Sequence, residues 1–255
     1  MLSFYDRHRQ GFHQEVYDEL MALDEQVFEV PLYEDALFVA REIMRRVRHN
    51  LKLLIPRLQK IGYRFGEGVW DDFDDLSADE KAHIQQDIPI FKTPTPETAN
   101  TVLLLEQRTG TLPLALRCWY EEVGCVNLIG LFPPMNSHAM KPDYGSILDP
   151  LFVYSVDMAL SMVQSYMIDG AWSRNPVLPL SPDQYYKYSL SGSGTYAIRL
   201  PCRTFDAPLL LERHHTTFVS YLRICLHWGG FLGLKVDNRV SYDTVEFLTK
   251  DFLRF

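Results

Sequence analysis

The chain has 255 residues, of which 47% are hydrophobic, and its formal net charge is −8 at pH 7. This composition is that of an ordinary globular protein, and the length suffices for a sizeable core. A net negative surface repels phosphate backbones, so we expect no nucleic-acid partner. No apolar run approaches the roughly 18 residues of a membrane span, and charges follow Met1 too closely for a signal peptide. We therefore expect a cytoplasmic protein that does not engage a membrane.

Amphipathic spacing characterises the first part of the chain. Residues 12–30 carry apolar side chains at every third or fourth position, which predicts a helix. The same spacing predicts a longer helix from Glu34 to Ile61, and Pro56 should kink or divide it. We interpret the basic residues of this second segment as a solvated helix face: Arg41, Arg45, Arg46, Arg48, Lys52, Arg57 and Lys60.

The following segment loses this periodicity. Residues 63–76 turn acidic, and a capping-box pattern in residues 77–86 predicts a short helix. A cluster of prolines within residues 88–96 marks a boundary. We therefore divide the chain into an N-terminal helical region, residues 1–90, which packs on the core or stands apart from it, and an α+β domain, residues 91–255.

Short strand-like runs alternate with helices in the second part of the chain. Helices are predicted after Thr95, from Leu112 to Gly124, for about eleven residues from Asp157, and from Thr216 or Thr217 to Trp228. Strands are predicted at Val126–Phe132, Leu151–Ser155, Gln184–Leu190 and Thr195–Leu200, and a hairpin turn at Ser191–Gly194 joins the last two. This arrangement is typical of an α+β fold.

The segment Leu112–Gly124, which reads LPLALRCWYEEVG, resembles the opening of the SUKH superfamily. That family includes yeast Smi/Knr-type cell-wall regulators and bacterial toxin-immunity proteins. The segments at Asp149–Val153, Tyr186–Ile198 and Phe218–Phe231 resemble its central strand, its hairpin and its closing helix. The resemblance covers residues 95–235 and implies a mixed, mainly antiparallel sheet flanked by helices, with an N-terminal helical extension outside the family core.

The same resemblance implies a function. Members of this family bind other proteins and are not enzymes, and the bacterial ones neutralise a toxin by binding it. We therefore expect a bacterial, immunity-type or regulatory adaptor that masks a partner protein. Because this is an analogy between folds, the residues themselves must supply the chemistry.

The residues that carry common catalytic chemistry do not form a recognisable pattern. The histidines include no pair at the spacing of a helical zinc site, and the chain has neither a GxSxG nor a phosphate-binding glycine loop. The cysteines Cys118, Cys125, Cys202 and Cys225 form no CxxC, so we interpret them as free buried thiols. We expect no catalytic residue, no cofactor and no metal site.

The most specific polar feature is an acidic run with aromatic residues inside it. One interpretation of this run is a solvated loop without a binding role. The other is a docking site for a basic partner, such as a toxin that binds nucleic acid. Aromatic side chains in the run would anchor the interface. The residues of this predicted partner-binding site are Trp70, Asp71, Asp72, Phe73, Asp74, Asp75, Asp79 and Glu80.

Two other classes of function stay open. The first is an enzyme whose site is assembled in a groove from residues distant in sequence, which would show convergent polar groups with strongly shifted pKa values. The second is a scaffold in which the basic helix of residues 34–61 makes the contacts.

Overall fold

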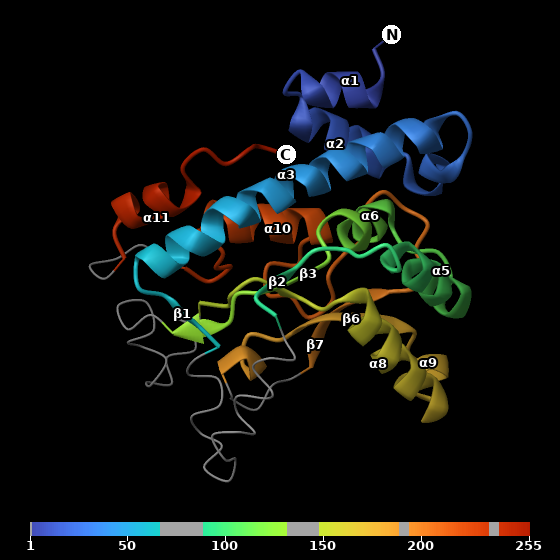
Figure 1. Ribbon diagram of the computed structural model, residues 1–255. Coiled ribbons are helices and arrows are strands. Elements are labelled where there is room, and N and C mark those ends of the chain that lie inside the picture. The colour runs from blue at the N-terminus through green and yellow to red at the C-terminus, as the bar shows by residue number, and fades with distance from the viewer. Residues whose placement is uncertain (1, 67–88, 132–147, 189–193, 235–239) are drawn as a thin grey trace.

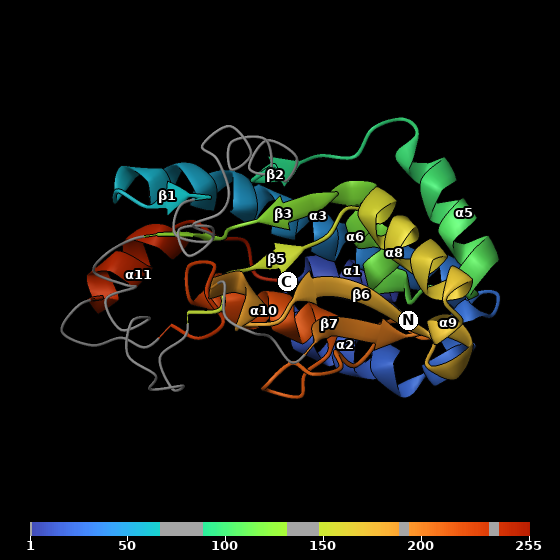
Figure 2. The same cartoon turned by 90° about the horizontal axis from the view of Figure 1, so that it is seen from below.

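The computed structural model describes residues 2–66, 89–131, 148–188, 194–234 and 240–255, and the fold is mixed α+β (Figure 1). Small antiparallel sheets are flanked by helices, which confirms the predicted fold class. Helices α3, α10 and α11 lie on one side of the strands, and α8 lies on the other (Figure 1). Seen from below, the β6–β7 hairpin lies in front of these layers (Figure 2).

The N-terminal region is helical, as predicted, but its segments differ from the prediction. The structure has α1 at Phe4–Arg9, α2 at His13–Ala22, a 3-10 helix at Asp24–Phe28 and α3 at Leu32–Lys60. The predicted helix over residues 12–30 is divided because Asp24 has a φ of 49°, outside the helical region. Pro56 does not divide α3. The buried residues Leu54 and Leu58 on either side of it hold the helix against the core.

Six further helices are described in the second part of the chain. They are α5 at Thr98–Thr109, α6 at Leu114–Glu122, α8 at Val156–Ile168, α9 at Ala171–Arg174, α10 at Phe218–His227 and α11 at Tyr242–Thr249. Hydroxyl side chains cap three of them, because Ser155, Thr217 and Ser241 each accept a hydrogen bond from an amide in the first turn. None of the helices in the described part is long and apolar enough to cross a membrane.

The strands in the described part of the chain are short, and those that pair are antiparallel. β1 at Arg64–Phe65 pairs with β4 at Gly130–Leu131, and β6 at Val177–Pro182 pairs with β7 at Thr195–Arg199. The remaining sheet has the order β2-β3-β5, formed by Phe91–Lys92, Cys125–Asn127 and Phe152–Val153. The predicted strand over residues 126–132 is therefore two strands, β3 and β4, which belong to different sheets.

The predicted strand Gln184–Leu190 is wrong. The first strand of this hairpin is β6, seven residues earlier, and Tyr186–Tyr188 is a 3-10 helix. The carboxylate of Asp183 accepts hydrogen bonds from the amides of Tyr185 and Tyr186, and this local turn competes with a strand. The predicted turn at Ser191–Gly194 lies mostly outside the described residues, as does the predicted helix over residues 77–86.

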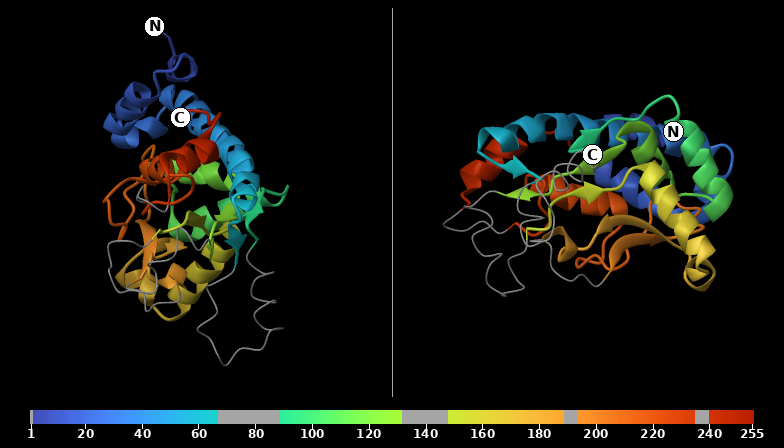
Figure 3. Two further views of the ribbon diagram at one scale, coloured as in Figure 1. Left: turned by 90° about the vertical axis from the view of Figure 1, so that its left-hand side faces the viewer. Right: turned by 60° about the horizontal axis from the view of Figure 1, so that its bottom comes forward.

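Both parts of the chain contribute to one buried core. The apolar stripe of α3 packs against α6, and both helices belong to the same cluster of buried residues. Trp119 on α6 is fully buried and meets Phe218 on α10 edge to face, with ring centroids 5.5 Å apart. Figure 3 shows α1 and α2 at one end of the molecule and the β6–β7 hairpin at the other, with α3 running between them.

The basic face of α3 is only partly solvated, which corrects the sequence interpretation. Arg41 lies 3.5 Å from a carboxylate oxygen of Glu121, and Arg45 lies 3.4 Å from one of Glu122. Arg48 donates a hydrogen bond of 2.9 Å to the main-chain oxygen of Glu122. These side chains therefore attach α3 to the end of α6, so reversing their charge would disturb the fold as well as any contact with a scaffold partner.

The same helix binds the C-terminal segment through its main chain. Asn50, which is buried, donates to the carbonyl of Leu253 at 2.9 Å and accepts from its amide at 2.8 Å. Arg46 donates to the main-chain oxygen of Arg254 at 2.8 Å, and Arg57 donates to those of Leu248 and Lys250. Residues 250–255 are thus fixed along α3 without being part of a helix or sheet.

We expect Asn50→Ala to release this segment. The change leaves two main-chain groups of Leu253 without their partner, which should lower the free energy of unfolding by about 1–3 kcal/mol. Hydrogen exchange should accelerate at the Leu253 amide far more than at amides of α6. Lys52→Ala, an exposed change on the same helix, is the matched control. Unchanged protection of Leu253 in Asn50→Ala would contradict this assignment.

Candidate functional site

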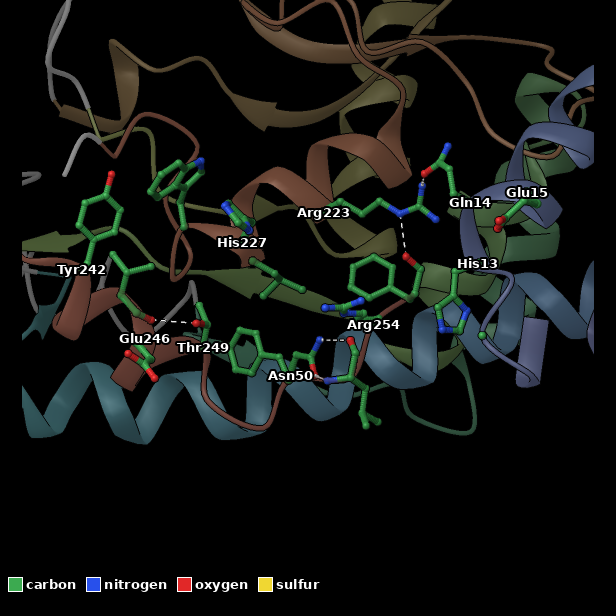
Figure 4. A pocket seen from close by; sticks show the side chains of 17 residues that line it. His13, Gln14, Glu15, Asn50, Arg223, His227, Tyr242, Glu246, Thr249 and Arg254 are labelled. Atoms are coloured by element: carbon green, nitrogen blue, oxygen red, sulfur yellow. Dashed lines mark hydrogen bonds between the residues drawn. The ribbon is translucent and has the colours of Figure 1, made fainter. Parts of the chain in front are cut away.

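A groove of about 850 Å³ lies between α10, α11, the start of α2 and the C-terminal segment (Figure 4). Four parts of the chain that are distant in sequence meet there. The polar and aromatic residues that line it include His13, Gln14, Glu15, Asn50, Arg223, His227, Trp228, Tyr242, Glu246 and Arg254. A concave site of this size accommodates a ligand or a short segment of a partner.

Helix α10 forms one wall of the groove. Its residues Phe218, Tyr221 and Leu222 are buried in the core, as the predicted amphipathic spacing requires. Arg223 and His227 are one helical turn apart and therefore both face the groove. The ring of His227, which is exposed, packs edge to face against Trp228 at 4.8 Å.

Arg223 closes the groove at the end near α2. Its Nε donates to the main-chain oxygen of Phe255 at 2.8 Å, and its Nη1 donates to the amide oxygen of Gln14 at 2.9 Å. The guanidinium also lies over the ring of Tyr17, 4.6 Å from its centroid. Arg223 therefore joins the C-terminal segment to α2 through Nε and Nη1, whereas its Nη2 is buried without a hydrogen-bond partner among the described residues.

A histidine pair lies behind this end of the groove. The rings of His8 and His13 are 4.4 Å apart, and Nε2 of His13 lies 3.1 Å from Nη1 of Arg46. Burial is the main cause that lowers the pKa of His8 to about 3, and the positive charges that His13, Arg46 and Arg223 carry or acquire contribute to the same shift. Burial and the neighbouring arginines also lower the pKa of His13. Both rings are therefore neutral at neutral pH.

This cluster predicts a loss of stability in mild acid. His8 binds a proton readily in the unfolded chain, near pH 6.5, but in the folded protein only near pH 3. Its contribution is therefore complete above pH 6.5 and is lost progressively as the pH falls towards 3, by at most about 1.4 kcal/mol per pH unit. Urea unfolding between pH 7.5 and 5 should show this slope. His8→Leu should flatten it, whereas His49→Leu, an exposed change on α3, should not. An equal slope in the wild type and His8→Leu would exclude His8 as the source.

A second polar cluster is buried in the core rather than in a groove. The Nζ of Lys187 donates to one oxygen of Asp149 at 2.6 Å, and the hydroxyl of Tyr196 donates to the other at 2.7 Å. Lys187 and Asp149 have no exposed side-chain surface, and Lys187 Nζ lies 5.0 Å from the centroid of the Tyr196 ring. This cluster joins the start of β5 to the connection between β6 and β7. Its complete burial keeps it from any substrate and favours a structural role.

We expect Lys187→Met to lower the free energy of unfolding by about 3–5 kcal/mol, because it leaves the Asp149 carboxylate buried without its cation. Adding Asp149→Asn should restore part of that loss. Asparagine tolerates the positive φ of 49° at this position, so the second change removes the charge without straining the backbone. Equal stabilities of the single and double variants in urea unfolding would argue against a coupled pair.

The other strongly shifted groups are also held inside the fold. Burial raises the pKa of the Cys118 thiol to about 12, and it also raises those of Cys125, Cys202 and Cys225. These thiols are free, as predicted, and protonated at neutral pH. Burial alone would raise the pKa of Glu212, but hydrogen bonds from His214 and Thr216 lower it. Within the described ranges, no group of three or more metal-binding side chains occurs.

The predicted partner-binding residues Trp70, Asp71, Asp72, Phe73, Asp74, Asp75, Asp79 and Glu80 lie outside the described residues. Their role as a docking site therefore stays a prediction. The groove was not foreseen. The sequence predicted α10 as a core helix and gave no indication of α11 or of the C-terminal segment as a wall. The spacing of Arg223 and His227 places both on one face of α10, but it does not indicate a groove beside that face.

Comparisons of the chain with protein-family models, with curated proteins and with solved structures returned no match. The SUKH resemblance of residues 95–235 therefore rests on the sequence motifs alone.

Proposed function

We propose that this protein is a non-enzymatic binding module, an immunity-type or regulatory adaptor of the SUKH type that masks a partner protein. The observation that carries the proposal is the groove of about 850 Å³ between α2, α10, α11 and the C-terminal segment. Its rim presents exposed side chains with aromatic or donor groups, among them His227 and Tyr242, and Tyr242 is 72% exposed. Exposed aromatic residues beside a concave surface are typical of protein interfaces.

The distribution of perturbed groups supports binding over catalysis. The buried thiols are protonated, the Asp149 carboxylate is saturated by Lys187 and Tyr196, and Arg223 is bound to Gln14 and Phe255. In an enzyme with its site in the groove, ionisable side chains with shifted pKa values would instead converge on the cavity and be free to react with a substrate. The pKa shifts of the cysteines, of His8 and of Tyr196 have burial as their main cause, which is what structural groups show.

The predicted acidic segment, Trp70 to Glu80, fits the same proposal as a second contact surface. An acidic adaptor associates faster with a basic partner, such as a toxin that holds nucleic acid, because opposite charges steer the encounter. The groove and the acidic segment make separate predictions, since one depends on shape and exposed aromatic residues and the other on charge.

The test is capture of a partner by the full-length, tagged chain in a lysate of the native host, followed by cross-linking and measurement of affinity with the purified partner. We expect one variant with His227→Ala and Tyr242→Ala to weaken binding about tenfold or more, because aromatic hot-spot residues contribute about 1 kcal/mol or more each. A second variant changes Asp71, Asp72, Asp74 and Asp75 to Asn and should weaken binding in a salt-dependent manner.

Lys52→Ala, exposed and distant from the groove lining, is the control and should bind as the wild type does. A partner that all three variants bind with equal affinity would remove both surfaces from the proposal. If the captured molecule were turned over chemically by the wild type, the adaptor function would give way to an enzyme with its site in the groove.

A further inference from the structure

Arg254 places a guanidinium in the groove that the fold does not use. Its main chain is fixed, because Arg46 binds its carbonyl and the flanking residues Leu253 and Phe255 are bound by Asn50 and Arg223. Its guanidinium has no hydrogen bond or ion pair with any residue in the described part of the chain. Figure 4 shows the Arg254 side chain inside the groove, between Asn50 and His13. A charged group is thus presented to a ligand from a rigid backbone.

Three arginines, Arg46, Arg223 and Arg254, gather at this end of the groove, although the whole chain is acidic. Arg223 donates to the neutral amide oxygen of Gln14 and to a main-chain oxygen of Phe255. Arg46 is neutralised in part by Glu42 at 2.8 Å. Glu15 also lines the groove, but its effect on the pKa of His13 is smaller than those of Arg46, Arg223 and Arg254, which lower it. An anionic group therefore meets a favourable potential beside Arg254.

The other end of the groove is apolar and aromatic. Leu226 and Val245 are buried in its floor, and Trp228 and Phe252 are partly buried beside them. Glu246 and Tyr242 lie at the rim of this end, on exposed turns of α11 (Figure 4). The cavity thus has an apolar surface at one end and an arginine at the other. A free inorganic anion would contact only the arginine, because it has no apolar part.

We propose that the groove binds an acidic peptide segment of a partner protein, with Arg254 pairing to a carboxylate of the segment and the floor around Trp228 and Val245 taking an apolar side chain. Arginine suits this role because its planar fork binds a carboxylate with two parallel hydrogen bonds. An apolar side chain of the segment would be buried against these groove residues, and such buried contacts anchor peptide segments at interfaces. This inference rests on the proposed binding function and names the chemistry of what that groove binds.

The experiment is a selection of randomised octapeptides displayed on phage, with the full-length chain immobilised, followed by anisotropy titrations of the enriched peptides carrying fluorescein. Enriched peptides should contain Asp or Glu together with an aromatic or Leu residue. Arg254→Glu should weaken their binding at least tenfold, and Arg254→Lys should weaken it less. Arg174→Glu makes the same charge change on exposed α9, at the opposite side of the molecule from the groove (Figure 1), and should bind the peptides as the wild type does.

Hydrogen exchange at the Leu253 amide shows whether Arg254→Glu keeps the C-terminal segment in place, and only a variant with wild-type protection is used. The inference is overturned if no octapeptide is enriched, if the enriched set has no acidic preference, or if Arg254→Glu binds as tightly as the wild type. Failure of the proposed function is a separate outcome. If His227→Ala with Tyr242→Ala weakens the captured partner while octapeptides show no acidic preference, the adaptor function stands and only the acidic segment is excluded.

Discussion

The packing of α3 is the constraint on which the rest of the structure depends. One face of this helix buries an apolar stripe, including Val47 and Leu54, in the same core as α6. Another face binds main-chain groups of the C-terminal segment through Asn50, Arg46 and Arg57. The groove exists because these two interfaces leave a space between them: α10 lies on the core side, and the C-terminal segment is held away from it along α3. A helix that was merely appended to the α+β part would leave no such cavity.

The use of charge explains how an acidic protein comes to present an unpaired arginine in a groove. The arginines of α3 pair with Glu121 and Glu122 or bind main-chain oxygens, so much of the basic charge is engaged within the fold. Surface pairs of this kind contribute little stability individually, but they fix the position of α3 on α6. Outside these pairs, the carboxylates therefore still outnumber the basic groups. The guanidinium of Arg254 is a cationic group in the groove that stays unpaired among the described residues. Charge complementarity in this molecule is therefore local and does not follow from the net value of −8.

Secondary structure that is encoded by neighbouring residues was predicted from the sequence. Features that depend on contacts between distant residues were not. The helix after Thr217 and the strand Thr195–Arg199 were predicted because a cap and a β-rich run are encoded by neighbouring residues. The strand assigned to residues 184–190 was wrong because aromatic content resembles strand propensity, whereas Asp183 binds the amides that a strand would need. The groove could not be predicted, since residues 13, 50, 223 and 254 meet only when α3 is packed. No local pattern reports that Asn50 binds Leu253.

Burial and exposure separate the structural groups of this protein from its candidate binding groups. His8 and Tyr196, whose pKa values are among the most strongly shifted, have at most 2% of their surface exposed. A shift of this origin measures the cost of placing an ionisable group in the core, and a buried group cannot touch a partner. A binding residue requires the opposite combination: a fixed backbone, an exposed side chain and donors that the fold does not occupy. Arg254 and His227 have this combination, because the first is anchored through its carbonyl and the second through α10. For an adaptor, the informative residues are therefore the exposed ones that the fold holds in position and leaves unsatisfied.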